Sequence, residues 1–248
     1  GAALKEKYPD AFVLLVGTHP SATVDETLAM SEKIDGIARR EYDYIVRDLA
    51  KALRDNAPLS DVRGLSFRRD GEIINNSDAE PIEDLDDIPF AADFINRRRN
   101  VTDYVFTAAA YPSIQIFTGR GCPAHCSFCV YPQTMHGHKY RLRSPEKVVA
   151  EFEYIIDHRK NVKEIGIEDD TFTANKRRTE EICRMLIERG ISKKIRWLCN
   201  ARVNLDYDTM VLMRKAGCHL IIPGIESVSQ EILNNIKKGT TVAQIENY

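Results

Sequence analysis

The 248-residue chain lacks any apolar run of the about 18 residues that a membrane-spanning helix needs. It also lacks an excess of charge of either sign, because 35 basic residues stand against 37 acidic ones. A basic surface for nucleic acid is therefore not expected. Six cysteines are too few for a disulfide scaffold in a chain of this length. These absences predict a chain without a membrane span or a nucleic-acid partner, in a reducing cytoplasm.

In the first third of the chain, short apolar runs alternate with segments whose apolar residues recur at helical spacing. Residues 11–17, "AFVLLVG", predict a buried parallel strand, and residues 35–39, "DGIAR", predict a second one. Residues 41–55 carry apolar side chains at helical spacing, among them Tyr44, Ile45, Leu49 and Leu53. This order predicts half of a doubly wound α/β domain. Because the chain begins and ends in the middle of such elements, we expect a fragment of a longer protein.

The pattern changes after residue 60. Residues 64–76, "GLSFRRDGEIINN", predict a hairpin around Asp70-Gly71. Residues 77–93 are acidic, contain two prolines and show no periodicity, which predicts a linker. A domain boundary is expected within residues 77–111.

From Ser113 onward, strands and helices alternate in four βα units, which predicts a parallel sheet with right-handed crossovers. The predicted strands are residues 113–119, 162–170, 194–201 and 218–227, and the predicted helices are residues 144–159, 175–190, 206–217 and 229–239. In such folds the chemistry lies at the carboxyl ends of the strands. Polar clusters follow each predicted strand, so we expect them to converge on one edge of the sheet.

Three cysteines follow the first of these strands. Cys122, Cys126 and Cys129 have the spacing C-x3-C-x2-C, and thiolates at such spacing select zinc or an iron–sulfur cluster. A structural zinc site needs a fourth ligand. The candidates for that ligand are His125, His136 and His138. Because Cys183, Cys199 and Cys218 are interpreted as small core residues, the pattern predicts three protein ligands and one open metal position.

The motif C-x3-C-x-(aromatic)-C, with Phe128 before the last cysteine, resembles the signature of radical SAM enzymes. The resemblance implies a 4Fe–4S cluster on the three cysteines, with an open iron that binds S-adenosylmethionine. It implies reductive cleavage of that cofactor to methionine and a 5′-deoxyadenosyl radical.

The same resemblance implies roles for polar residues at the other strand ends. Acidic residues after the second strand would accept the amino group of S-adenosylmethionine, and an arginine after the third would pair with its carboxylate. The residues after the fourth strand resemble the ribose-contacting positions, with a glycine for close approach. Phe128 would pack around the adenine or the cluster. The residues concerned are Glu168, Asp169, Asp170, Arg202, Gly224, Glu226 and Ser227.

The front of the chain resembles the later part of the cobalamin-binding domain that precedes many radical SAM cores. The loop after its strand maps to Gly17, Thr18 and His19. The D-x-H-x-x-G loop of that family does not occur in this chain, and His19 is not its metal-ligating histidine.

The expected fold is therefore α/β, a partial (β/α) radical SAM barrel preceded by part of a doubly wound, flavodoxin- or Rossmann-like cobalamin-binding domain. The expected segments are 1–60 for the cobalamin-binding part, 61–111 for the hairpin and linker, and 112–248 for a truncated radical SAM core. Within the family, "CVYPQT", "GHKYRLRSPE" and "EDDTF" are most similar to members associated with hopanoid biosynthesis, and more distantly to anaerobic magnesium-protoporphyrin ester cyclases.

The resemblance implies cobalamin-assisted methylation or rearrangement of a small or lipid-like substrate, with electrons from a donor such as flavodoxin or ferredoxin. No residue is assigned as the catalytic acid or base. Two alternatives stay open. One is a relative of the tRNA methylthiotransferases, and the other is a zinc-stabilised binding module.

Overall fold

The computed structural model describes residues 1–248, apart from the side chain of Asn96. It divides into two compact units. Unit 1 comprises Gly1–Ile82 and Cys129–Gly137, and unit 2 comprises Glu83–Phe128 and His138–Tyr248. The chain first passes from unit 1 to unit 2 between Ile82 and Glu83, within the range 77–111 in which a domain boundary is expected. The assignment of three segments to named domains stays a prediction.

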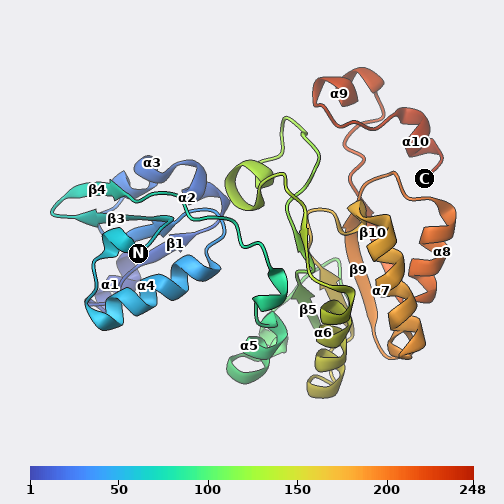
Figure 1. Ribbon diagram of the computed structural model, residues 1–248, viewed down its shortest axis with the longest axis horizontal. Coiled ribbons are helices and arrows are strands. Elements are labelled where there is room, and N and C mark those ends of the chain that lie inside the picture. The colour runs from blue at the N-terminus through green and yellow to red at the C-terminus, as the bar shows by residue number, and fades with distance from the viewer. The chain divides into compact units, whose positions relative to one another are not determined.

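Unit 1 is built on a four-stranded sheet in the order β1-β2-β3-β4 (Figure 1). The strands β1 (Leu14–Val16) and β2 (Gly36–Ala38) are parallel, as the sequence predicts. The predicted hairpin is present as β3 (Leu65–Arg69) and β4 (Glu72–Asn75), with Asp70 and Gly71 both at positive φ. The hairpin also extends the same sheet, because β3 pairs with β2 in antiparallel register, a pairing that the sequence analysis does not predict.

Short helices complete unit 1, and the longest is α4 (Asp43–Asp55). Its residues Ile45, Leu49 and Ala52 are buried in one core with Leu65 and Phe67 of β3. Leu53, which the periodicity places on the buried face, is 44% exposed, so Ala52 continues the buried stripe in its place. The remaining helical segments of unit 1 are α1 (Ala2–Lys7), α2 (Thr18–Ala22), α3 (Val24–Ala29), the 3₁₀ turn η1 (Leu59–Asp61) and the π-helical turn η4 (Pro132–His136).

Unit 2 contains a parallel four-stranded sheet in the order β10-β9-β8-β5, which confirms the predicted βα series. Its strands are β5 (Ser113–Ile116), β8 (Glu164–Ile167), β9 (Arg196–Ala201) and β10 (Cys218–Pro223). The helices α6 (Pro145–His158), α7 (Lys176–Glu188) and α8 (Tyr207–Lys215) follow the first three strands and pack along the sheet (Figure 1). Two short helices, α9 (Gln230–Asn235) and α10 (Val242–Glu246), end the chain.

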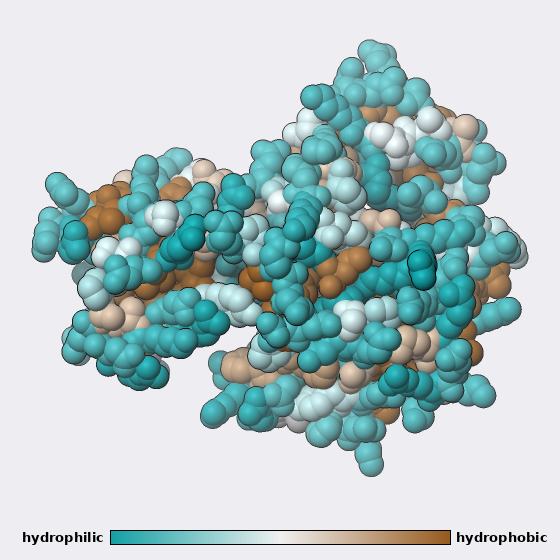
Figure 2. Space-filling view, in the orientation of Figure 1, coloured by the Kyte–Doolittle hydropathy of each residue, from teal (hydrophilic) through white to brown (hydrophobic). Residues whose placement is uncertain are grey.

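A continuous apolar core joins this sheet to its helices. Phe152 and Ile155 of α6, Ile182 and Leu186 of α7, and Trp197 of β9 are all nearly inaccessible to solvent. On the face drawn in Figure 2 the surface is mainly hydrophilic, as expected when the apolar side of each helix is turned toward a sheet. Among the described residues, no helix has both the length and the apolar character needed to cross a membrane.

Part of the predicted linker is helical. The structure has a 3₁₀ turn η2 (Leu85–Asp87), a helix α5 (Ala91–Arg98) and a further turn η3 (Val101–Asp103). In α5, Ala92 is fully buried, and Asp93 accepts a hydrogen bond of 2.7 Å from the hydroxyl of Tyr154 on α6. Two turns of helix offer too few apolar positions for the period to be recognised in the sequence.

The N-cap of α6 gives a first prediction. The hydroxyl of Ser144 accepts a hydrogen bond of 3.2 Å from the backbone N–H of Lys147, as the sequence predicts. Replacing Ser144 by alanine leaves that N–H without its cap and should lower the free energy of unfolding by about 1 kcal/mol. Chemical denaturation measures the loss. Ser144→Thr keeps the hydroxyl, so it should recover most of the stability; a threonine variant as unstable as the alanine one contradicts the role of the cap.

A buried ion pair links α6 to Arg143, which lies just before the helix. Arg143 Nη1 lies 2.7 Å from Glu151 Oε2, and both side chains are almost fully buried. The same guanidinium donates to the carbonyl oxygens of Leu85 and Ile88. Burial raises the pKa of Glu151 to about 7, because the loss of hydration outweighs the attraction of Arg143.

This raised pKa predicts a pH dependence of stability. Between the ordinary pKa of 4.5 and the folded value of about 7, the folded chain holds a proton that the unfolded chain has released. The contribution of Glu151 to stability is therefore largest at low pH and is lost as the pH rises through this window. Glu151→Gln cannot titrate. Denaturation from about pH 5 to about pH 8 should show the wild type losing up to about 3 kcal/mol relative to this variant. A constant difference between the two proteins contradicts the prediction.

Candidate active site

The three clustered cysteines lie on one loop at the carboxyl end of β5. This cysteine loop, residues 121–140, is closed at its base by two short antiparallel strands, β6 (Gly119–Arg120) and β7 (Arg141–Leu142). It includes a π-helical turn, η4 (Pro132–His136). The ends of the loop belong to unit 2, and residues 129–137 are grouped with unit 1.

Cys122, Cys126 and Cys129 form no disulfide, and all three are partly exposed. Cys183, Cys199 and Cys218 are buried, as expected for core residues. Within the described residues, no three or more His, Cys, Asp or Glu side chains are grouped so as to hold a metal. The structure therefore places the three sulfurs on one loop without gathering them around a common point.

The histidines of the loop make contacts other than to thiols. His125 and His138 stack with their ring centroids 4.1 Å apart, and His138 Nδ1 lies 3.1 Å from the carbonyl oxygen of Cys122. This geometry makes His138 a partner of the loop backbone.

The base of the loop is fastened by a buried network that begins at Asp169. Its carboxylate accepts hydrogen bonds of 2.6 Å from both the backbone N–H and the hydroxyl of Thr118, which lies between β5 and β6. Asp169 is fully buried, and burial raises its pKa against the effect of these hydrogen bonds. Both oxygens are thus engaged by the chain itself.

Arg178 completes this network from the first turn of α7. Its Nη2 donates to the carbonyl oxygen of Thr118 at 2.8 Å, and its Nε donates to that of Arg143 at 2.9 Å. The side chain is buried, and burial lowers the pKa of the guanidinium from its ordinary value. Arg178 therefore ties together the two chain segments that enter and leave the hairpin at the base of the loop.

The other two acids after β8 point toward different partners. Asp170 Oδ2 accepts a hydrogen bond of 3.1 Å from the N–H of Gly121, at the start of the cysteine loop. Glu168 Oε1 accepts one of 3.0 Å from Gln115 Nε2 on β5. Both side chains are partly exposed, so they keep carboxylate surface available at the carboxyl edge of the sheet.

Arg202, directly after β9, reaches the cysteine loop. Its Nη1 lies 3.8 Å from Cys126 Sγ. Its Nη2 donates to the carbonyl oxygen of Lys238 and lies 3.4 Å from Thr240 Oγ1. One guanidinium thus connects a cysteine with the segment that follows α9.

The residues after β10 surround the ammonium of Lys238. Glu226 Oε1 lies 2.9 Å from Lys238 Nζ, and Glu226 has a backbone φ of 66°. Phe128 is 54% exposed, and its ring centroid is 6.0 Å from the same Nζ. A Cβ added at Gly224 would lie only 2.8 Å from Nζ, so the room at this glycine accommodates a lysine of the chain itself. The hydroxyl of Ser227 accepts from the N–H of Ser229 and shapes the approach to α9.

In unit 1, the predicted loop residues lie at the carboxyl end of β1. Gly17 has a φ of 110° and caps α2, and no atom lies within 4 Å of the position that its Cβ would take. Thr18 begins α2, and the side chain of His19 is exposed. This edge therefore presents an open glycine backbone next to a helix start.

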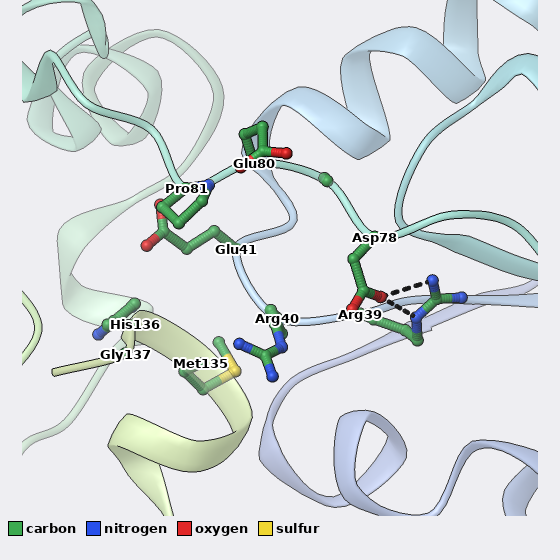
Figure 3. Close-up of a pocket in the computed structure, with 10 residues that line it drawn as sticks. Arg39, Arg40, Glu41, Asp78, Glu80, Pro81, Met135, His136 and Gly137 are labelled. Atoms are coloured by element: carbon green, nitrogen blue, oxygen red, sulfur yellow. Dashed lines mark hydrogen bonds and ion pairs between the residues drawn. The ribbon is translucent and has the colours of Figure 1, made fainter. Parts of the chain in front are cut away.

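A pocket within unit 1 opens at the carboxyl end of the neighbouring strand β2 (Figure 3). Arg39 is held there by Asp78, at 2.8 Å. Arg40 has a φ of 61°, and its backbone N–H donates to Ser21 Oγ at 2.9 Å, which links the pocket to α2. Met135 and His136 of η4 line the same pocket. Since β1 and β2 are parallel, the pocket and Gly17 share one edge of the sheet.

A comparison of the sequence with models of protein families identifies the family of this chain. The model of the radical SAM superfamily matches residues 116–247, somewhat more than half of the chain, and the match includes all three clustered cysteines. The chain belongs to the radical SAM superfamily. The predicted resemblance to the family is thus confirmed, and in this radical SAM chain the three cysteines follow β5, the first strand of the βα series.

Curated relatives of the radical SAM chain include enzymes of several activities. An uncharacterized methyltransferase of Pyrococcus horikoshii is 32% identical over 95% of this chain and 50% of the relative. The anaerobic magnesium-protoporphyrin IX monomethyl ester cyclase of Cereibacter sphaeroides is 32% identical over 96% of the chain and 39% of the relative. The hopanoid C-3 methylase of Methylococcus capsulatus is 25% identical over 97% and 44%. Both predicted groups are present, and the cyclase matches at the higher identity.

Solved structures share the fold of the radical SAM chain. The cobalamin-dependent S-adenosylmethionine radical enzyme OxsB superimposes with a TM-score of 0.77 and 23% identity, over 98% of this chain and 35% of that one. The radical S-adenosylmethionine methyltransferase TsrM of Kitasatospora setae gives a TM-score of 0.72 and 17% identity, over 96% and 46%. This radical SAM chain therefore spans half or less of the length of these proteins.

Three residues of the site were not anticipated from the sequence of the radical SAM chain. Thr118 and Arg178 carry no motif of their own, and their roles depend on burial. Lys238 was included in a helix predicted for residues 229–239, whereas α9 ends at Asn235 and a turn follows. The available signal was the run "KKGTT", since a glycine followed by two threonines marks the end of a helix and a turn.

Proposed function

We propose that this chain is part of an enzyme that binds a 4Fe–4S cluster on the cysteine loop together with S-adenosylmethionine, and that uses cobalamin to methylate or rearrange a small or lipid-like substrate. The observation that carries the proposal is the position of the cysteine loop. It follows the first strand of a parallel sheet, and Asp170, Arg202 and Glu226 follow β8, β9 and β10 at the same edge. In α/β folds of this kind, the catalytic and ligand-binding residues lie at this edge of the sheet.

The chemistry of the donor set fits an iron–sulfur cluster. Cys122, Cys126 and Cys129 form no disulfide, and three cysteines on one loop are a ligand set that iron–sulfur clusters use. The Arg202 guanidinium lies beside Cys126. Binding has to draw the three sulfurs together within a loop whose ends β6, β7 and Arg178 already fix. When bound, the cluster supplies the electron that splits the sulfonium of S-adenosylmethionine.

The chain's own residues would hold and orient that molecule. Glu168 and Asp170 present carboxylate surface for its ammonium group. Arg202 offers Nη1 for its carboxylate, and Glu226 offers an acceptor for its ribose hydroxyls. We assign Asp169 to a different task, because both of its oxygens already hold Thr118. Asp169 positions the loop on which the cluster ligands lie.

The carboxyl edge of β1 and β2 is our candidate for cobalamin. Gly17, Thr18 and His19 lie there, and the open space at Gly17 allows a large planar ligand to approach the backbone. OxsB has been solved with aqua-cobalamin and S-adenosylmethionine bound, and TsrM with cobalamin and a [4Fe-4S] cluster. Retention of added cobalamin through gel filtration tests this part of the proposal, and Gly17→Val, which fills the space, should abolish the retention.

Two further proposals follow from the same chemistry. An electron donor such as flavodoxin or ferredoxin would supply the reductant that cleavage consumes. A cytoplasmic location would keep the three cysteines of the loop reduced until they bind iron.

Anaerobic reconstitution of the chain with iron and sulfide tests the central proposal. We expect a brown protein with about four irons per chain. After addition of dithionite and S-adenosylmethionine, we expect 5′-deoxyadenosine by liquid chromatography. A colourless protein that retains one tightly bound zinc would overturn the proposal in favour of a zinc-stabilised module. Cluster formation followed by methylthio transfer to tRNA would redirect it to the methylthiotransferase group.

A further inference from the structure

Lys238 occupies an unusual position in unit 2. Its side chain is 7% exposed, and its ammonium lies between the carboxylate of Glu226, the backbone at Gly224 and the ring of Phe128. Burying an ammonium costs free energy unless a charged partner compensates it. The pairing with Glu226 Oε1 at 2.9 Å supplies that partner.

The backbone around Lys238 is anchored to the cysteine loop from two sides. The carbonyl oxygen of Ile236 accepts a hydrogen bond of 2.9 Å from the N–H of Ser127, between the second and third cysteines. Arg202 donates to the carbonyl oxygen of Lys238 while its other nitrogen faces Cys126. The position of the ammonium is therefore coupled to the loop that carries the cluster ligands.

Glu226 depends on this arrangement. A φ of 66° is unfavourable for a residue other than glycine, and it persists only where the surroundings stabilise it. The ion pair with Lys238 engages Oε1. Oε2 is then left as an acceptor with a fixed direction, which suits the adjacent hydroxyl pair of a ribose.

We propose that Lys238 is a positioning residue that acts through Glu226, holding its carboxylate in place for the vicinal hydroxyls of a nucleoside ligand. The inference rests on the proposed function, with S-adenosylmethionine as the nucleoside. Gly224 is part of the same arrangement, because any side chain there would displace the ammonium. Lys238 thus contributes to affinity for the ribose and not to affinity for the amino-acid end of the ligand.

The test replaces Lys238 by methionine, which keeps an unbranched side chain of similar size and removes the ammonium. In the anaerobically reconstituted protein, Lys238→Met should keep the wild-type iron content and bind S-adenosylmethionine about tenfold more weakly in equilibrium dialysis. Lys238→Arg should recover part of the affinity. The matched control is Lys237→Met, because the neighbouring lysine is exposed, and this variant should bind as the wild type does.

Two further measurements identify the route of the effect. If Lys238 acts through Glu226, the double variant Glu226→Gln/Lys238→Met should bind no more weakly than Glu226→Gln alone. In competition experiments, Lys238→Met should weaken the binding of 5′-deoxyadenosine, which has the ribose hydroxyls, and leave that of methionine unchanged. If the effects of the two substitutions on binding are additive in the double variant, the inference is overturned. If Lys238→Met weakens only the binding of methionine, the inference is also overturned, and the ammonium is assigned to the carboxylate of the ligand.

The failure of the inference is distinguishable from the failure of the proposed function. A wild-type protein that takes up no cluster, or that binds no S-adenosylmethionine, defeats the proposed function. A wild-type protein that does both, together with a Lys238→Met variant of equal affinity, defeats only the role of Lys238.

Discussion

Replacing Cys126 by alanine should leave a protein that cannot assemble its cluster. In the proposed site each of the three cysteines would supply one sulfur ligand, and a loop with two thiols would retain too few ligands for a stable 4Fe–4S centre. We expect the visible absorption and the iron content after reconstitution to fall to background, and the formation of 5′-deoxyadenosine to stop. Iron and sulfide analysis and optical spectroscopy measure the effect directly.

The chain offers a matched control for this experiment. Cys183 is fully buried in α7, within the core of unit 2 and outside the cysteine loop. Cys183→Ala should lose at most about 1 kcal/mol of stability and keep its full iron content. Equal iron in the wild type and in Cys126→Ala, or loss of iron in Cys183→Ala, would contradict the assignment of the ligands.

The second large effect is expected at Arg178. Methionine at this position removes two charge-assisted hydrogen bonds, to the carbonyl oxygens of Thr118 and Arg143, and leaves both acceptors buried. It also removes the positive charge that favours the ionised form of Asp169. We expect Arg178→Met to lower the free energy of unfolding by about 3 kcal/mol, measured by chemical denaturation. Because these bonds fasten the base of the cysteine loop, the folded variant should also take up less iron.

The adjacent arginine is the control for Arg178. Arg177 is exposed on the same turn of α7, so Arg177→Met removes the same charge without touching the network. It should change stability by no more than about 0.5 kcal/mol and leave the uptake of iron intact. If the two variants behave alike, the buried network does not hold the loop.

The sequence alone predicted the parallel sheet of unit 2 and the place of the cysteines in it. Uninterrupted apolar runs and helix caps are local features of the sequence, and the structure contains the elements that they predict. The strands β5, β8, β9 and β10 and the N-cap Ser144 are examples. The antiparallel pairing of β3 with β2 was not predictable in the same way. That pairing is decided by contacts between segments about 30 residues apart, which no local period encodes.

The site shows the same division between local and distant information. The alternation of strands and helices alone predicted that Asp170, Arg202 and Glu226 follow their strands at one edge. Predicting that Asp169 faces inward needed the location of Thr118, and the role of Arg178 depends on a residue 60 positions earlier in the chain. The burial of Lys238 was not predictable either, because it depends on the ion pair with Glu226 and on the missing side chain at Gly224.

The short ladder between β6 and β7 has a consequence for substitutions within the cysteine loop. It pairs Gly119 with Leu142 and Arg120 with Arg141, so backbone hydrogen bonds hold the two ends of the loop side by side. A substitution between those ends therefore leaves the attachment of the loop to the sheet in place, and its effect on the rest of the fold should stay small.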